Sequence, residues 1–451
     1  MKKYIALSAI TFGLLSTGVN AADDLESMFK DGKVSGQIRA FYVDREYQGS
    51  AGKNDHRNAQ AIGGYLKFVT DDYKGLKFGT AFYTTNGFLL NSPKNDFTQN
   101  DMTLLGNNNE SYTMLGEAFV EYKYENTGFK GGRVKYSSPM MGADDARMLP
   151  NLFEAYMLTN TDLADTTISI AHVTKFAQGT FGRVYGAGLL AATSGYSAVN
   201  SDPVDSGKFE NMGSYAFGEK SNGVTVASIE YKGIDNLKLR LYDYYADDVM
   251  NTIYGDVNFK WNCLFSDTIK PFAAAQFIKE DDVGDQIIGD ALGGNGEIDS
   301  FYWAAKIGAK YKGFMAYLAY SQTTDNDAGE TYQNAIITTW GGMPAYTQGM
   351  VTRHMFLAGT NATKVVGAYS FKEQGVNLST ALYYASFDMD ENSGYGIART
   401  AYEPGFDIKY YPAAVKNLQL RFRGNFPRKF ADAGSGNTGW NEYRFIVNYN
   451  F

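Results

Sequence analysis

Apolar and polar residues alternate with a period of two along most of the chain beyond residue 33. In the last segment, one set of alternate positions is apolar and the other polar: Tyr443, Phe445, Val447, Tyr449 and Phe451 against Glu442, Arg444, Asn448 and Asn450. Successive side chains of a β-strand point to opposite faces, so this pattern predicts strands with one apolar and one polar face. We expect eighteen such strands, with sixteen as the alternative, centred near residues 40, 65, 82, 118, 134, 156, 170, 227, 241, 256, 274, 306, 319, 367, 381, 406, 421 and 446.

The connections between these strands have two lengths. Short turns are expected at residues 71–75, 232–236, 311–313 and 372–375, and long loops at about 91–110, 177–221 and 326–360. Two-faced strands fit either a soluble sandwich, whose apolar faces pack together, or a membrane barrel, whose apolar face contacts lipid. Short turns at one end and long loops at the other are typical of outer-membrane barrels. We therefore predict an all-β fold, an antiparallel up-and-down transmembrane β-barrel with short periplasmic turns and long extracellular loops.

The N-terminal segment has the pattern of a secretory signal peptide. Lys2 and Lys3 precede a short apolar run at residues 5–15, and small residues follow around Ala21. This order of basic, apolar and small residues is the one that signal peptides share. We expect cleavage after Ala21, so that residues 1–21 are the signal peptide and residues 22–451 form the barrel. Loss of two lysines would change the net charge from −8 to −10.

Composition argues against several classes of protein. Charged residues make up 20% of the chain, and no apolar stretch long enough for a membrane helix follows the N-terminal segment, which argues against a helical bundle. With one cysteine and three histidines, neither a metal site nor a cofactor is expected. A Gly-x-Ser-x-Gly motif is absent, so no enzyme is expected. Basic residues are outnumbered by acidic ones, so no nucleic-acid partner is expected either.

The C-terminus carries an independent signal. The last predicted strand ends on an aromatic residue, Phe451. Such an end resembles the signal that the barrel-assembly machinery of Gram-negative bacteria binds. Aromatic residues reach 15% of the chain, which suits girdles at the two membrane–water interfaces. These features predict an integral protein of the Gram-negative outer membrane, in contact with its lipids and lipopolysaccharide.

Three stretches resemble the OprD-type family of substrate-specific outer-membrane porins. They are Gly132–Tyr136 followed by Arg147–Glu154, the turn segment Glu230–Leu239, and the strand Lys416–Arg423 together with Arg444. The Leu-Pro-x-x-Phe-Glu piece at residues 149–154 is the most specific of them. The resemblance implies that the loop after the fifth strand, Ser137–Pro150, folds into the lumen and narrows it with Asp144, Asp145 and Arg147. It also implies a column of lumen-facing basic residues that guides carboxylate-bearing solutes.

Basic residues on the polar face of the predicted strands are the candidates for this column. They are Arg39, Arg133, Lys135, Lys238, Arg240, Arg421 and Arg423, with Lys306 and Lys310 nearer a turn. Rings or columns of Lys and Arg select anions, and arginine can bind a carboxylate through two parallel hydrogen bonds. The alternative is that these charges only hydrate a wide, non-specific pore.

We therefore expect a water-filled channel for passive diffusion of small hydrophilic solutes and ions, with amino acids and organic acids as candidate solutes. The alternative function is a surface-exposed structural or adhesive barrel, in which the long loops matter more than the pore. A homo-oligomer and a monomer are both compatible with the sequence.

Overall fold

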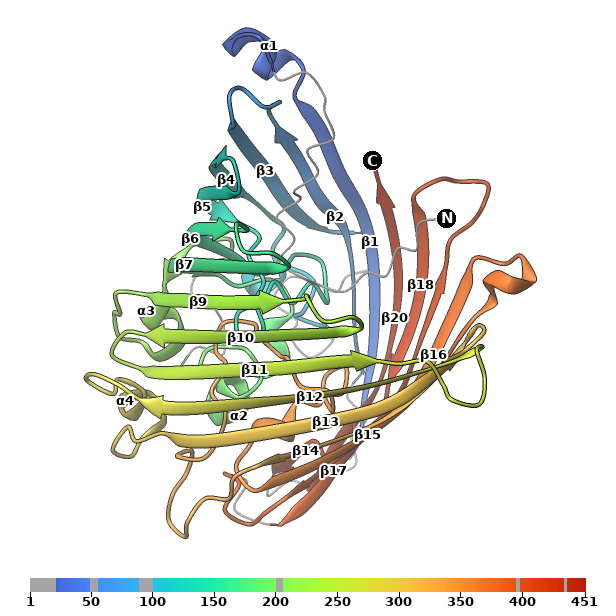
Figure 1. Cartoon of the computed structure of the whole chain (residues 1–451). Helices are drawn as coiled ribbons and strands as arrows, with labels where there is room; N and C mark the ends of the chain where they lie inside the picture. The colour runs from blue at the N-terminus through green and yellow to red at the C-terminus, as the bar shows by residue number, and fades with distance from the viewer. Residues whose placement is uncertain (1–21, 49–55, 89–99, 200–205, 395–397, 434–435) are drawn as a thin grey trace.

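The computed structural model describes residues 22–48, 56–88, 100–199, 206–394, 398–433 and 436–451. Antiparallel strands run side by side around one closed barrel in these ranges (Figure 1). The strands of the wall are β1 (Lys33–Gln48), β2 (His56–Val69), β3 (Leu76–Gly87), β4 (Tyr112–Tyr124), β5 (Thr127–Val134), β6 (Leu152–Asn160), β7 (Thr166–Ala177), β9 (Val224–Tyr231), β10 (Leu237–Ala246), β11 (Met250–Lys260), β12 (Ile269–Asp282), β13 (Asp299–Tyr311), β14 (Phe314–Thr323), β15 (Thr360–Ser370), β16 (Leu378–Met389), β17 (Arg399–Tyr410), β18 (Leu418–Asn425) and β20 (Gly436–Asn450). The predicted signal peptide, residues 1–21, lies outside the described residues.

The count of eighteen wall strands is confirmed. Of the twenty strands in the described ranges, β8 (Glu210–Asn211) and β19 (Ala431–Ala433) are short additions that pair with β7 and β20, which leaves eighteen in the wall. Each wall strand contains one of the predicted centres. The ring closes because β1 pairs with β2 on one side and with β20 on the other, where Gln37 is opposite Asn450. Closure satisfies the backbone hydrogen bonds that lipid would leave unpaired.

Helical segments are short. In the described ranges they are the α-helices α1 (Leu25–Lys30), α2 (Leu189–Ala192), α3 (Met212–Phe217) and α4 (Ile288–Leu292), and the 3-10 turns η1 (Asn107–Asn109), η2 (Gly182–Val184), η3 (His354–Phe356) and η4 (Phe371–Gln374). None of these helices has the length and hydropathy of a membrane-spanning helix.

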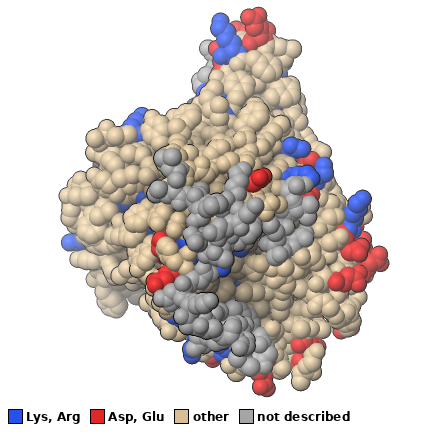
Figure 2. Space-filling model, turned by 180° about the vertical axis from the view of Figure 1, so that it is seen from behind, with Lys and Arg blue, Asp and Glu red and all other residues tan. Residues whose placement is uncertain are grey.

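The predicted separation of apolar and polar faces is present along the wall. On β1, Val34 and Ile38 are 60% and 50% exposed on the outer surface, whereas Phe41 and Val43 are buried inside. On β20 every second residue from Tyr443 to Phe451 points outward. Uncharged residues cover most of the described surface that is visible in Figure 2. The outer surface is therefore the lipid-facing one, and the polar parity of the strands points into the lumen.

Connections at the two ends of the barrel differ as expected. The turns at the end that holds the start of β1 are short, and several of them use a polar residue with a left-handed backbone: Asp165, Asn236 and Asn417 have φ of 55°, 63° and 64°. Asn and Asp tolerate that conformation because their short side chains bond locally. At the other end lie the described parts of the long loops 88–111 and 178–223, which exclude residues 89–99 and 200–205, and the loops 135–151 and 324–359. One connection at that end is short, residues 247–249 between β10 and β11.

Candidate functional constriction

The loop at residues 135–151 crosses the interior of the barrel. At one side Arg39 of β1 donates from Nη1 to Asp145 Oδ1 at 2.6 Å. At the other side the backbone N–H of Met140 donates to the hydroxyl of Tyr244 on β10 at 3.3 Å. β10 lies about halfway around the ring from β1. A loop that touches both strands must span the lumen, which confirms the expected fold of this loop into the barrel.

Asp145 joins the loop to two cations. Its carboxylate accepts from Arg39 and from Lys135 Nζ, the latter at 3.0 Å. Burial raises the pKa of the Asp145 carboxyl, but the charges and hydrogen bonds of Arg39 and Lys135 outweigh it and lower the pKa to about 2. Asp145 is therefore ionised at neutral pH and cancels part of the positive charge at this edge of the lumen.

The lowered pKa of Asp145 predicts a change in ion selectivity at acid pH. The ion pairs contribute fully above the ordinary pKa of 3.8 and are lost as pH falls through about 2. We expect the anion preference of the wild-type channel, measured by reversal potential in a salt gradient, to rise as pH falls through about 2. The Asp145→Asn variant should show the higher anion preference already at pH 7. Wild-type selectivity of this variant at pH 7 would contradict the prediction.

Arg147 is fully buried rather than exposed to solute. Its Nη2 donates to Glu442 Oε1 of β20 at 2.8 Å, and its Nε donates to Thr103 Oγ1 at 2.9 Å. Glu442 is also fully buried and accepts from Arg45 and Arg444. Arg147 thus fixes the root of the loop to the wall, and it does so by sharing one carboxylate with two other arginines.

Asp144 ties the loop at residues 135–151 to the other long loops. It accepts from Tyr196 OH at 2.7 Å and from Arg353 Nη2 at 2.8 Å. The same loops also bond through their backbones, because Gly142 N–H donates to Trp340 O at 3.0 Å. Three loops therefore pack together as one body: 135–151, 178–223 and 324–359. This loop body lies inside the barrel, in the half that holds the long loops.

The loop at residues 324–359 is held against the wall by two buried carboxylates. Glu280 of β12 accepts from the Ile337 N–H at 2.7 Å. Glu403 of β17 accepts from the N–H groups of Val351 and Thr352, at 3.2 and 2.8 Å. Because both glutamates are fully buried, their bonds to the loop backbone fix its path across β12–β17.

Most of the basic residues predicted to line the lumen are paired with acids. Lys238 lies 2.6 Å from Glu230, and Arg240 forms a two-pronged pair with Asp256. Arg421 donates from Nε to Asp407 Oδ1 at 2.8 Å. Arg423 makes only a 3.9 Å contact with Asp407, and in the described residues its buried Nε has no hydrogen-bond partner. The predicted column is therefore largely neutralised, and Arg423 is its least compensated arginine.

Arg133 has a different place from the one that parity predicted. In the sheet it is opposite Ala118, whose neighbours along β4, Glu117 and Phe119, are the ones directed inward. The Arg133 guanidinium lies over the Phe209 ring at 4.5 Å instead. Arg133 therefore lies at the outer rim of the wall and does not line the lumen.

The family of the chain follows from comparison with known proteins. The model of the OprD family, described as outer membrane porins, matches residues 26–451.

The chain belongs to the OprD family of outer-membrane porins.

Solved structures agree on the fold. The chain is similar to OccK9 (OpdG) of Pseudomonas aeruginosa, with 19% identity and a TM-score of 0.72, and to OpdK of the same species, solved with vanillate, with 16% identity and a TM-score of 0.72. It is also similar to a BenF-like porin of Pseudomonas fluorescens Pf-5, with 17% identity and a TM-score of 0.73. Each comparison covers 94% of this chain and 99% of the other. Comparison with curated proteins gives no match.

Strand register places three lysines of this OprD-family porin in one row. Lys306 and Lys364 are both opposite Ala319, and the row continues through Ala274 and Asn258 to Lys238. Neighbouring strands lie about 4.8 Å apart, so Lys306 and Lys364 stand about 10 Å apart. Only Ala319, a small residue, lies between them in the row.

Lys364 was missed by the sequence analysis, whereas Lys306 was named there as a lumen-facing candidate nearer a turn. Parity could have found Lys364, because Thr363 and Val365 on either side of it are exposed on the outer face. In the described residues neither lysine has a carboxylate within 4.0 Å. Lys306 Nζ lies 3.9 Å from the ring centre of Tyr346, and Lys364 Nζ donates to Gln348 O at 2.6 Å. Both lysines thus keep their net charge while contacting loop 324–359.

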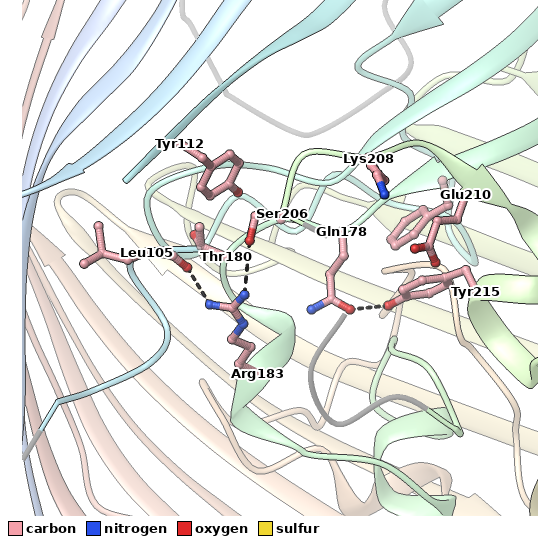
Figure 3. Close-up of a pocket in the computed structure, with 11 residues that line it drawn as sticks. Leu105, Tyr112, Gln178, Thr180, Arg183, Ser206, Lys208, Glu210 and Tyr215 are labelled. Carbon is pink, nitrogen blue, oxygen red and sulfur yellow. Dashed lines mark hydrogen bonds between the residues drawn. The ribbon is translucent and has the colours of Figure 1, made fainter. Parts of the chain in front are cut away.

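A small crevice lies among the outer loops, away from this row (Figure 3). Arg183 crosses it and donates from Nη1 to Leu105 O at 2.7 Å. On the other side Tyr215 OH donates to Gln178 Oε1 at 2.5 Å. The Arg183 bond joins loop 88–111 to loop 178–223, and the Tyr215 bond lies within loop 178–223, so the crevice is a seam within the loop body.

Proposed function

We propose that this porin conducts small hydrophilic solutes by passive diffusion and favours those that carry a carboxylate. The observation that carries the proposal is the presence on the lumen side of Lys306 and Lys364, which have no carboxylate within 4.0 Å in the described residues, together with Arg423, whose contact with Asp407 is 3.9 Å long. An anion that enters a narrow pore loses part of its hydration, and fixed cations compensate for that loss. The paired residues Lys238, Arg240 and Arg421 offer less compensation because their charges are already balanced.

The arrangement of partners supports a route along this row. Lys306 contacts an aromatic face and Lys364 a backbone carbonyl, and both are neutral groups that a carboxylate can outcompete. OpdK, which shares the fold, was solved with vanillate. Vanillate is a carboxylate, and its presence in a protein of the same architecture supports carboxylates as the solutes of this porin. The same proposal includes amino acids and organic acids as solutes. It also includes contact of the barrel with lipopolysaccharide and its delivery by the barrel-assembly machinery.

Uptake into liposomes tests the proposal. Swelling rates are measured for pairs of solutes that differ only in charge, each pair being a small carboxylate and the amide of the same acid. We expect the carboxylate to enter faster, by about tenfold if the contacts together favour it by roughly 1.4 kcal/mol. Equal rates would show that the basic residues only hydrate the pore. Planar bilayers supply the check on the channel itself, since the absence of conductance steps would favour the surface-adhesion alternative.

A further inference from the structure

The turn between β11 and β12 ends in two bare apolar side chains. Leu264 and Phe265 are 92% and 94% exposed, which exceeds every other large apolar residue described as exposed. A bridge between Cys263 and Ser266 closes the chain on either side of them. The turn is thus an ordered hairpin whose tip consists of Leu264 and Phe265.

This tip departs from the chemistry of the neighbouring turns. Exposed turns favour Gly, Asn, Asp and Ser, for backbone and hydrogen-bonding reasons. Other turns at this end use Asn236 and Asn417 at left-handed positions, and their apolar residues, such as Leu163 and Ile234, are only 58% and 50% exposed. Leu264 and Phe265 are not in the left-handed region, so backbone geometry does not call for them. Two large apolar residues at such a tip indicate a surface that is covered by something apolar.

The tip continues the lipid-facing surface of the barrel. On the outer face of β11, Ile253 and Phe259 are 36% and 43% exposed. Trp261, at the base of the hairpin, stacks on Phe259 with ring centres 5.5 Å apart. Tryptophan and phenylalanine at the edge of a lipid belt mark the membrane–water interface. An apolar strip therefore runs from the lipid belt through Trp261 to the tip.

We propose that the Leu264–Phe265 tip inserts into the periplasmic leaflet of the outer membrane and anchors this end of the barrel. The turn lies at the barrel end that also holds the start of β1, which is the periplasmic end of the fold. Continuity with the lipid belt favours lipid over a protein partner as the occupant. Two hydrogen bonds stiffen the hairpin. The backbone N–H of Trp261 donates to Pro271 O, and the Ser266 and Thr268 hydroxyls bond to each other at 2.8 Å. The proposal is independent of which solute the channel favours.

The chain carries its own reporter position for the test. Cys263, the single cysteine of the sequence, directly precedes Leu264 and is partly exposed. We would attach an environment-sensitive fluorophore (NBD) to Cys263 and reconstitute the protein in lipid nanodiscs, which leave both leaflets accessible. The matched control carries Cys263→Ser with Glu373→Cys, which puts the same label on the polar η4 turn at the same end of the barrel.

Insertion predicts a blue-shifted emission at position 263 and quenching by lipids with a nitroxide near the glycerol level, at least threefold stronger than at position 373. Leu264→Ser combined with Phe265→Ser should reduce the quenching at 263 to the control level. Heat-modifiable mobility on gels shows that each variant still forms the barrel. Water-like emission at 263 in pure lipid would overturn the proposal and point to a protein partner instead. Quenching that persists in the double variant would also overturn it, because the label would then lie near lipid without help from the tip.

Discussion

Replacement of Glu442 by glutamine is expected to destabilise the loop body by about 3–5 kcal/mol, the usual cost of removing one partner from a buried ion pair. Glu442 is fully buried and accepts from Arg45, Arg147 and Arg444. The variant would leave three buried guanidinium groups with Asp101 as the remaining acid, 3.2 Å from Arg45. Because Arg147 links loop 135–151 to β20, its release should loosen the root of the loop, while the contacts of Asp144 and Asp145 still hold its middle.

Two measurements check this expectation. Urea titration followed by the fluorescence of Trp340 and Trp440 should show an early transition in Glu442→Gln that the wild type lacks, because Trp340 bonds to this loop and Trp440 lies over Arg45. Single-channel conductance should rise and become noisier, while the barrel itself survives because its strand pairing is untouched. Glu373→Gln, in an exposed turn at the other end, is the matched control and should behave as wild type. A Glu442→Gln channel with wild-type conductance and urea midpoint would show that the arginines are satisfied in another way.

The wall of the barrel was predictable because its signal is local. A strand in a membrane barrel must present apolar residues to lipid at every second position, as Tyr443 and Phe445 do on β20. Turn chemistry is local as well, and Asn236 and Asn417 mark their turns in the sequence. The short connection at residues 247–249 shows the limit of the loop-length argument, because nothing near it in sequence distinguishes the two ends of the barrel.

The site was less predictable because its geometry depends on register and on contacts between distant segments. Parity places Arg240 inside, but only the pairing of β10 with β11 shows that Asp256 balances its charge. The same holds for Arg147, whose partner Glu442 is 295 residues away in sequence. Arg133 fails for a local reason, since along β5 it shares the face of Phe129, which is exposed outside, whereas Lys130 and Val134 take the inward positions.

Neutralising the two unpaired lysines of the row should remove most of the preference for carboxylates. A hydrogen bond to a charged group contributes about 1.5–3 kcal/mol, and 1.4 kcal/mol corresponds to tenfold in affinity. The double variant Lys306→Gln with Lys364→Gln should therefore lower the ratio of carboxylate to amide uptake by about tenfold or more. Glutamine is one bond shorter than lysine but keeps an N–H donor, so a hydrogen bond toward Gln348 O remains available while the charge, and with it the cation–π contact with Tyr346, is lost.

Lys310→Gln is the matched control for this experiment. Lys310 lies on the same strand as Lys306 with the same parity, but it is exposed near the β13–β14 turn and outside the row. Removing its charge should change conductance slightly through the overall field and leave the uptake ratio within about twofold, since exposed charges are screened over about 10 Å at 0.1 M salt. If Lys310→Gln lowered the ratio as much as the double variant does, the preference would arise from net charge alone. If neither variant changed it, solute would pass the constriction on the opposite side, where Arg39 and Lys135 meet Asp145.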